Sequence, residues 1–234
     1  MKVLVIIPAY NEEATIRHTV LRLQRTCPYD YLVINDGSTD RTGEILDQCG
    51  FRHLDLPVNL GIGGAMQTGY RYALEHGYDY AIQLDADGQH DPDDLETLVA
   101  EIAASDYDMV IGSRFVEKTG YKGSRLRRLG ILYFCFLLYL ACGVKITDPT
   151  SGYRIVNRRI IREFARDYPV DYPEVEVIAR LAKKGYRIKE TKVEMNARQG
   201  GRSSITPLKS LYYMTKVTFT SLIRAMFETR EGRT

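Results

Sequence analysis

YAIQLDADGQHDPDD, residues 80–94, joins an apolar, strand-like run to an acidic segment. The run ends in two carboxylates two positions apart, Asp85 and Asp87. Because side chains alternate along a strand, both should leave the sheet on one side, where their charges repel unless a cation lies beside them. We therefore expect Mg²⁺ or Mn²⁺, held by Asp85, Asp87 and the amide oxygen of Gln89 and shared with a diphosphate.

The same segment has a simpler interpretation as an acidic loop that caps the next helix. Asp91 suits the N-cap position and Pro92 suits the first residue of the helix. This alternative explains Asp91, Asp93 and Asp94. It leaves two carboxylates at the end of an apolar strand unexplained, so we favour the metal.

Apolar strand-like runs alternate with helix-like segments through the first half of the chain. This order predicts an α/β fold in which a mostly parallel sheet carries helices on both faces. Ligands of such sheets bind at the carboxyl ends of the strands. The expected strands cover residues 3–8, 31–35, 51–56, 80–84 and 109–112, and the expected helices cover residues 12–25, 41–49, 63–76 and 92–104.

Polar residues follow the expected strands and should collect at one edge of the sheet. Tyr10, Asn11 and Glu12 follow the first strand, and Asp36 follows the second. A carboxylate at the end of a strand can accept an N–H from a base or a hydroxyl from a sugar, and we favour this role for Asp36. Turn and capping chemistry alone explains its neighbours in NDGSTD, residues 35–40.

Three glycines precede another expected helix in NLGIGGAMQTG, residues 59–69. Backbone N–H groups and the helix dipole there can face a ligand anion, and on this ground we count Gly63 among the nucleotide-binding residues. The spacing differs from the dinucleotide fingerprint, whose glycines follow the first strand. A tight turn explains the glycines equally well.

The second half shows no linker and no repeat, so we expect one domain over residues 1–204 whose later elements build the acceptor side. Residues 205–234 should form an amphipathic helix, from Thr206 to about residue 227, and a tail. The later elements are a basic loop at residues 117–130, an apolar run at 129–144, DPTSGYRIVNRR at 148–159, a helix near 174–184 and a strand near 187–195.

Bulk properties exclude several classes of protein. The chain has 234 residues, and 32 Lys and Arg against 30 Asp and Glu are too balanced for a dedicated nucleic-acid binder. The four cysteines lack the spacing of a zinc site or redox dithiol, as expected of reduced thiols in the cytoplasm. The N-terminus reads as a strand, not a signal peptide, and the apolar run is shorter than the roughly 18 to 20 residues that span a bilayer.

Six motifs in order resemble the inverting GT-A glycosyltransferases, in particular the branch of dolichol- or polyprenyl-phosphate mannose and glucose synthases. They are VIIPAYNEE, VINDGSTD, NLGIGGAMQTG, LDADGQHDP, GSR and DPTSGYR, and the similarity runs from Val3 to about Ser204. One departure is Asn35, where many relatives carry a second Asp. The resemblance implies that Pro8, Tyr10, Glu12, Asp36 and Asp85 hold the nucleotide and that Asp85, Asp87 and Gln89 bind the metal and diphosphate.

The acceptor decides which further groups are needed. A hydroxyl acceptor requires a base, whereas a phosphate monoester, with a second pKa of about 6, is already anionic and requires cationic donors. We assign Arg114, Arg125, Arg128 and Arg202 to the acceptor phosphate, although a solvated basic loop is the usual fate of such charge runs. Asp148 should position the reacting groups, with a base or a turn cap as alternatives. The expected catalytic residues are Asp87, Arg114, Asp148 and Arg202.

The apolar run at residues 129–144 fits either a buried helix or an interfacial helix at lipid headgroups, and the resemblance favours the second. Many relatives carry transmembrane helices after this point. Because we find no such helix in this chain, we expect that it relies on a partner membrane protein. Among the histidines only His90 lies near the expected site, in a supporting or surface role.

We expect hexose transfer from a UDP- or GDP-sugar to a polyprenyl phosphate at the cytoplasmic face of the membrane. The alternatives are transfer to a glycan hydroxyl and a silent nucleotide-sugar-binding scaffold.

Overall fold

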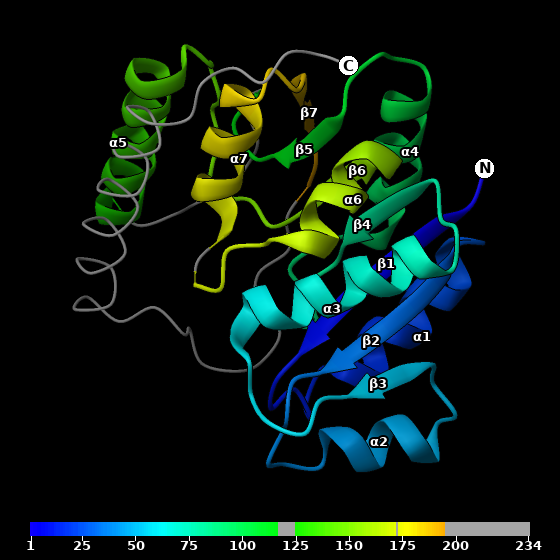
Figure 1. Cartoon of the computed structure of the whole chain (residues 1–234). Helices are drawn as coiled ribbons and strands as arrows, with labels where there is room; N and C mark the ends of the chain where they lie inside the picture. Colours follow the sequence, from blue (N-terminus) through cyan, green and yellow to red (C-terminus); the bar gives the residue numbers. More distant parts are fainter. Residues whose placement is uncertain (117–124, 172, 195–234) are drawn as a thin grey trace.

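The computed structural model describes residues 1–116, 125–171 and 173–194 (Figure 1). Several expectations lie outside the described residues: the C-terminal helix and tail at 205–234, Arg202, and the side chain of Arg125. The division into a domain over residues 1–204 and a C-terminal segment therefore stays a prediction.

One sheet of seven strands forms the centre of the molecule, in the order β3-β2-β1-β4-β6-β5-β7. All neighbouring pairs are parallel except those of β6, which runs antiparallel to β4 and β5. The strands are β1 (Val3–Ala9), β2 (Asp30–Asn35), β3 (His53–Asp55), β4 (Tyr80–Gln83), β5 (Met109–Ser113), β6 (Arg154–Asn157) and β7 (Ile188–Lys192).

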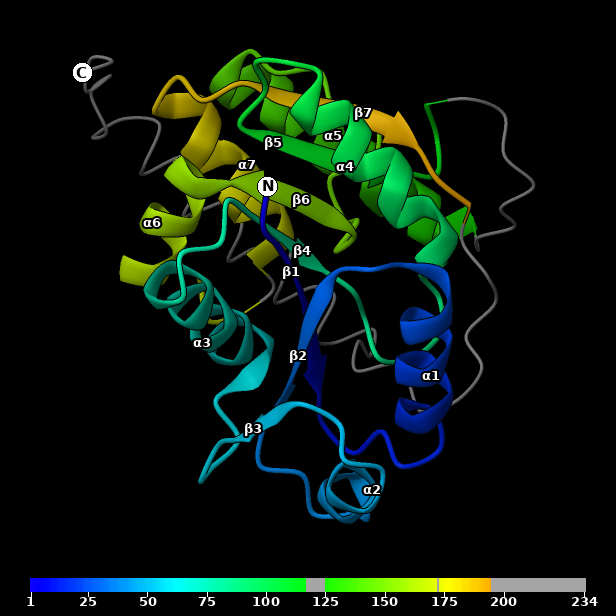
Figure 2. The same ribbon diagram turned by 90° about the vertical axis from the view of Figure 1, so that its right-hand side faces the viewer.

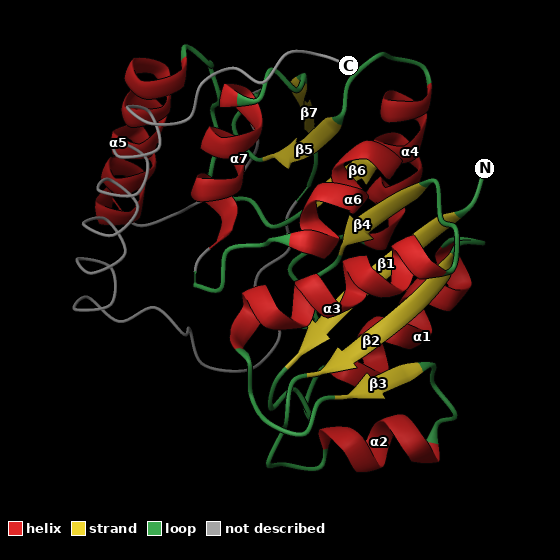
Figure 3. Ribbon diagram, in the orientation of Figure 1, coloured by secondary structure: helices red, strands yellow, loops and turns green. Residues whose placement is uncertain are grey.

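Helices cover both faces of this sheet (Figures 2 and 3), which confirms the predicted α/β fold. The helices are α1 (Ile16–Thr26), α2 (Thr42–Gln48), α3 (Gly61–Glu75), α4 (Leu95–Ala103), α5 (Arg125–Cys142), α6 (Arg158–Arg166) and α7 (Pro173–Lys183), with a 3₁₀ turn, η1 (Pro92–Asp94), before α4. Along β1 the side chains alternate: Leu4 and Ile6 join the core under α3, α5, α6 and α7, and Val5 and Ile7 join the core under α1, α2 and α4.

Strand β6 and helix α6 were not predicted from the sequence. Ile155 and Val156 are both buried because β6 lies between two other strands and is covered on both faces. At Asn157 the chain turns directly into α6, and the Asn157 side chain accepts the backbone N–H groups of Arg159 and Ile160. This N-cap starts a helix without a loop.

The strand ends place the later loops at one edge of the sheet. Ala9 pairs with Asn35 where β1 and β2 end, and Gln83 at the end of β4 pairs with Arg154, the first residue of β6. Because β6 is antiparallel, the loop that precedes it reaches the edge at which the parallel strands end. We call residues 148–153 the acceptor-side loop.

Candidate active site

An acidic turn follows β4 at the carboxyl edge of the sheet. The backbone N–H of Asp85 donates to Nδ1 of His90 at 3.0 Å, and that of Gln89 donates to Oδ1 of Asp87 at 3.0 Å. The Asp85 side chain is 35% exposed, whereas Asp87 is 4% exposed. The strand ends at Gln83, so the argument from strand alternation was wrong: this turn, not the pleat of the sheet, orients the two carboxylates.

The next acidic residues have the capping role that the sequence suggested as an alternative. The Asp91 side chain accepts the N–H of Asp93, and Pro92 is the first residue of the 3₁₀ turn. Arg22 of α1 pairs with Asp91 at 2.6 Å. Capping therefore accounts for Asp91, but it does not account for Asp85 and Asp87.

The surroundings of Asp85 fit a divalent cation shared with a ligand. The Asp85 side chain is 35% exposed, which leaves its carboxylate accessible to a cation. A Cβ on Gly152 of the acceptor-side loop would lie 3.4 Å from Asp85 Oδ2 and 2.8 Å from Gln83 Nε2, so only glycine lets the loop pack this closely against the acidic turn. Within residues 1–116, 125–171 and 173–194, no three His, Cys, Asp or Glu side chains form a complete metal site. Mg²⁺ in particular binds one or two carboxylates together with substrate phosphates and water. The metal set of Asp85, Asp87 and Gln89 stays a prediction.

The loops after β1 and β2 bind each other. Asn11 has a left-handed backbone, with φ of 55°, and its Oδ1 accepts the N–H of Thr39 at 2.8 Å. The backbone N–H of Glu12 donates to Thr42 Oγ1 at 2.9 Å, and the Glu12 carboxylate accepts the Thr15 hydroxyl. Tyr10 is 48% exposed beside these contacts, and Pro8 is half-buried on β1. The nucleotide roles of Pro8, Tyr10 and Glu12 stay predictions.

Asp36 holds the entry to α3. Its side chain is 3% exposed, and Oδ1 accepts the backbone N–H of Leu60 at 2.7 Å. Burial raises the pKa of the Asp36 carboxyl, and the N–H groups of Leu60 and Gly61 partly oppose that rise. These contacts give Asp36 a structural task, and its contact with a nucleotide stays a prediction.

Gly63 packs against backbone rather than facing a ligand. Its N–H donates to the carbonyl of Val170 at 3.1 Å, and a Cβ at this position would lie 2.0 Å from the carbonyl oxygen of Pro169. The N–H is therefore already used, and the glycine is required for α3 to approach residues 167–171. The argument that this N–H faces an anion was wrong, and a contact of Gly63 with the nucleotide stays a prediction.

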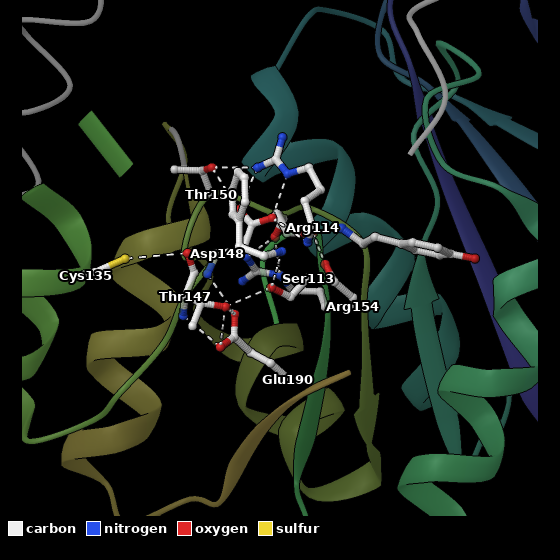
Figure 4. Close-up of polar contacts among 12 residues, drawn as sticks. Ser113, Arg114, Cys135, Thr147, Asp148, Thr150, Arg154 and Glu190 are labelled. Atoms are coloured by element: carbon white, nitrogen blue, oxygen red, sulfur yellow. Dashed lines mark hydrogen bonds and ion pairs between the residues drawn. The ribbon is translucent and has the colours of Figure 1, made fainter. Parts of the chain in front are cut away.

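A buried ion pair fixes the acceptor-side loop to the end of β5 (Figure 4). Arg114 donates from Nε to Asp148 Oδ2 and from Nη2 to Oδ1, both at 2.6 Å, and its Nη2 also reaches Thr150 Oγ1 at 3.0 Å. The side chains of Arg114 and Asp148 are 3% and 0% exposed. The expectation that Arg114 opens into the mouth of the site was wrong, because its guanidinium is buried against Asp148.

Glu190 of β7 completes this anchor and was not predicted. Its carboxylate accepts the backbone N–H groups of Thr147 and Asp148, each at 2.7 Å (Figure 4). Two charge-assisted bonds thus hold the backbone where the acceptor-side loop begins. A charged residue in the short strand IKETK was the available signal, although ordinary surface polarity explains it equally well.

Arg154 ties the loop to α7 and was also missed. Its side chain is fully buried, and it donates to the carbonyl of Ser151 and, through Nη1, to the carbonyl of Glu174 at 3.2 Å. Burial raises the pKa of the Glu174 carboxyl, while the Arg154 charge lowers it and the Asp85 charge raises it further. The first turn of α7 therefore lies within electrostatic reach of Asp85.

Of the other predicted cations, Arg128 is described. It is exposed near the start of α5, where its role in binding the acceptor phosphate stays a prediction.

The mostly parallel sheet of seven strands with helices on both faces is a GT-A fold. The crystal structure of glucosyl-3-phosphoglycerate synthase from Mycobacterium tuberculosis, in complex with Mn²⁺, uridine diphosphate and phosphoglyceric acid, matches with a TM-score of 0.74. The match covers 99% of this chain and 80% of that chain at 20% identity, and it supports the fold alone.

The chain belongs to glycosyl transferase family 2, whose model matches residues 4–165. The undecaprenyl-phosphate mannosyltransferase of Micrococcus luteus is 34% identical over 220 residues, which are 88% of this chain and 88% of that protein. The UDP-N-acetylglucosamine–dolichyl-phosphate N-acetylglucosaminyltransferase of Methanococcus voltae is 32% identical over 175 residues. The match covers 67% of this chain and 70% of that protein. The predicted resemblance and enzyme class are confirmed.

Proposed function

We propose that the protein transfers a hexose, with inversion, from a nucleotide-diphosphate sugar to a polyprenyl phosphate. The observation that carries the proposal is the juxtaposition of the Asp85 turn with the anchored acceptor-side loop at the carboxyl edge of the sheet. Similar proteins whose names specify undecaprenyl or dolichyl phosphate support the acceptor. Asp85 and Asp87, with Gln89, would hold Mg²⁺ or Mn²⁺, which stabilises the negative charge of the leaving diphosphate.

The ion pair at Asp148 favours a phosphate acceptor over a hydroxyl. Both carboxylate oxygens of Asp148 accept N–H groups of Arg114, so this carboxylate is poorly placed to remove a proton. A phosphate monoester needs no strong base near neutral pH, because its attacking oxygen is already charged. Asp148 and Arg114 then act by holding the loop beside Asp85.

Helix α5 supports attachment to a membrane surface. Figure 1 shows it at the outer side of α7, and its inner side chains Phe134, Leu137 and Leu138 are buried. The helices of the described residues include none with the length and apolar character to cross a bilayer. The interpretation as a buried helix applies to this inner face, and the proposed contact with lipid headgroups concerns the opposite face. The exposed apolar side chains recur at intervals of three and four and form the outer face: Leu129, Leu132, Tyr133, Phe136, Tyr139 and Leu140.

We expect the double substitution Leu132→Glu and Phe136→Glu to lower binding to anionic vesicles by at least about 10-fold, because each side chain gives up about 1.5 to 3 kcal/mol of apolar burial. Co-sedimentation with phosphatidylcholine–phosphatidylglycerol vesicles measures the change. The matched control is Val58→Glu, since Val58 is 59% exposed in the loop after β3. Equal loss of binding in the control would argue against α5 as the lipid-facing surface.

The proposed reaction is tested with purified protein, Mn²⁺, polyprenyl phosphate and a panel of radiolabelled UDP- and GDP-sugars. We expect one donor to place label in the organic extract, and no label when polyprenol replaces polyprenyl phosphate. Label in a soluble glycan instead of the lipid would support the hydroxyl-acceptor alternative. Donor binding without transfer to either acceptor would support a silent scaffold.

A further inference from the structure

Two buried polar side chains face the two oxygens of the Asp85 carboxylate. Gln83, 2% exposed at the end of β4, donates from Nε2 to Asp85 Oδ1 at 3.0 Å. His90, whose side chain is 3% exposed, places Nε2 at 3.6 Å from Asp85 Oδ2. Neither residue belongs to the expected ligand set of the metal, and both are buried.

The backbone of the acidic turn selects the tautomer of His90. Nδ1 accepts the N–H of Asp85 at 3.0 Å, so in the neutral ring the proton is on Nε2 and points toward Asp85 Oδ2. The ring stacks on Tyr153, with centroids 4.5 Å apart, and the Tyr153 hydroxyl donates to the carbonyl of Asp91 at 2.8 Å. The imidazole is therefore held in one orientation by contacts on its edge and on its face.

We propose that Gln83 and His90 are positioning residues that fix the direction of the Asp85 carboxylate for the cation. This inference rests on the proposed function, because it gives a reason for the orientation of a metal-binding group. Polar groups behind a metal ligand restrict its rotation, and their loss typically weakens metal binding by about 10- to 100-fold. The Asp85 side chain is 35% exposed, and this exposed part is left for the cation and its ligand.

A purely structural role for these side chains is the competing explanation. The Nδ1 contact closes the turn between Asp85 and His90, so His90 could serve folding alone. Substitutions of His90 that replace only one of its two ring nitrogens distinguish the two explanations. Asn at this position keeps an acceptor near the place of Nδ1, and Gln keeps a donor near the place of Nε2.

The first test compares Gln83→Met with Gln24→Met. Methionine has a similar length and volume but donates no hydrogen bond. Gln24 makes a comparable contact, from Nε2 to the Tyr31 hydroxyl at 2.9 Å, at an exposed place on α1. With UDP present, we expect Gln83→Met to bind Mn²⁺ about 10-fold more weakly by electron paramagnetic resonance titration, and Gln24→Met to match the unmodified protein. Equal affinities in the two variants would overturn the role of Gln83.

The second test compares His90→Gln with His90→Asn in the same titration, with the midpoint of thermal unfolding recorded for each. We expect His90→Gln to stay within about 3-fold of the unmodified protein and His90→Asn to bind Mn²⁺ about 10-fold more weakly. An affinity for His90→Asn equal to or above that of His90→Gln would overturn the positioning role. Failure of the unmodified protein to bind Mn²⁺ with UDP would instead contradict the proposed function itself.

Discussion

Asp148→Asn is expected to lower the free energy of unfolding by about 3 to 5 kcal/mol, because it leaves the Arg114 guanidinium buried without its counter-ion. The paired side chains are 3% and 0% exposed, so water cannot replace the lost carboxylate. In a protein of 234 residues this corresponds to a fall of roughly 6 to 20 °C in the midpoint of thermal unfolding. Urea unfolding followed by circular dichroism measures the change directly.

Asp167→Asn provides the matched control. Asp167 pairs with Arg180 at 2.7 Å, but its side chain is 63% exposed, so we expect a loss below about 1 kcal/mol. Replacing Arg114 and Asp148 together by Leu should recover part of the stability, since no uncompensated charge remains. If the two Asn variants unfolded within about 1 kcal/mol of each other, the ion pair would not be the anchor of the acceptor-side loop.

Asp87→Asn is expected to lower kcat/KM by about 10²- to 10⁴-fold, because the cation would lose a charged ligand and stabilise the leaving diphosphate less well. The substitution preserves the turn, since the Asn oxygen can still accept the N–H of Gln89 in place of Asp87 Oδ1. Initial rates of lipid labelling at several Mn²⁺ concentrations measure the effect.

Asp93→Asn is the control for this substitution. Asp93 lies in the same acidic segment, but its side chain is 66% exposed and contacts Arg22 at 3.3 Å. We expect its activity to stay within about 3-fold of the unmodified protein. Similar activity in Asp87→Asn and Asp93→Asn would remove Asp87 from the reaction.

Much of the sheet could be predicted because its signals are local. The runs at β1, β2, β4 and β5 are apolar and short, and helices of regular spacing separate them, as a parallel sheet covered on both faces requires. Strand β6 has only four residues, begins with Arg154 and is followed by a helix without a turn. Its place between β4 and β5 depends on tertiary pairing, for which the sequence carries no local pattern.

The position of the acidic turn at the carboxyl edge of the sheet could be predicted from the sequence, whereas the groups that support the turn could not. Asp85 and Asp87 are conspicuous because two charges follow an apolar strand. The pairing of Arg114 with Asp148 joins residues 34 positions apart, and neither side chain indicates from the sequence that it faces the other. The glycine at position 63 suggested anion binding, but its reason is close packing against Pro169 and Val170. Composition does not distinguish these two uses of a glycine.

The placement of a cation and diphosphate beside Asp85 and Asp87 is tested most directly by a crystal structure. The crystal is soaked with Mn²⁺ and with the nucleotide sugar that transfers label to the lipid in the activity assay. Diffraction data at the manganese absorption edge locate the metal without assumptions about its ligands. We expect an anomalous peak at coordination distance from both carboxylates, with the diphosphate of the donor bound to it. A metal located elsewhere, or a donor bound away from the carboxyl edge of the sheet, would contradict the proposed site.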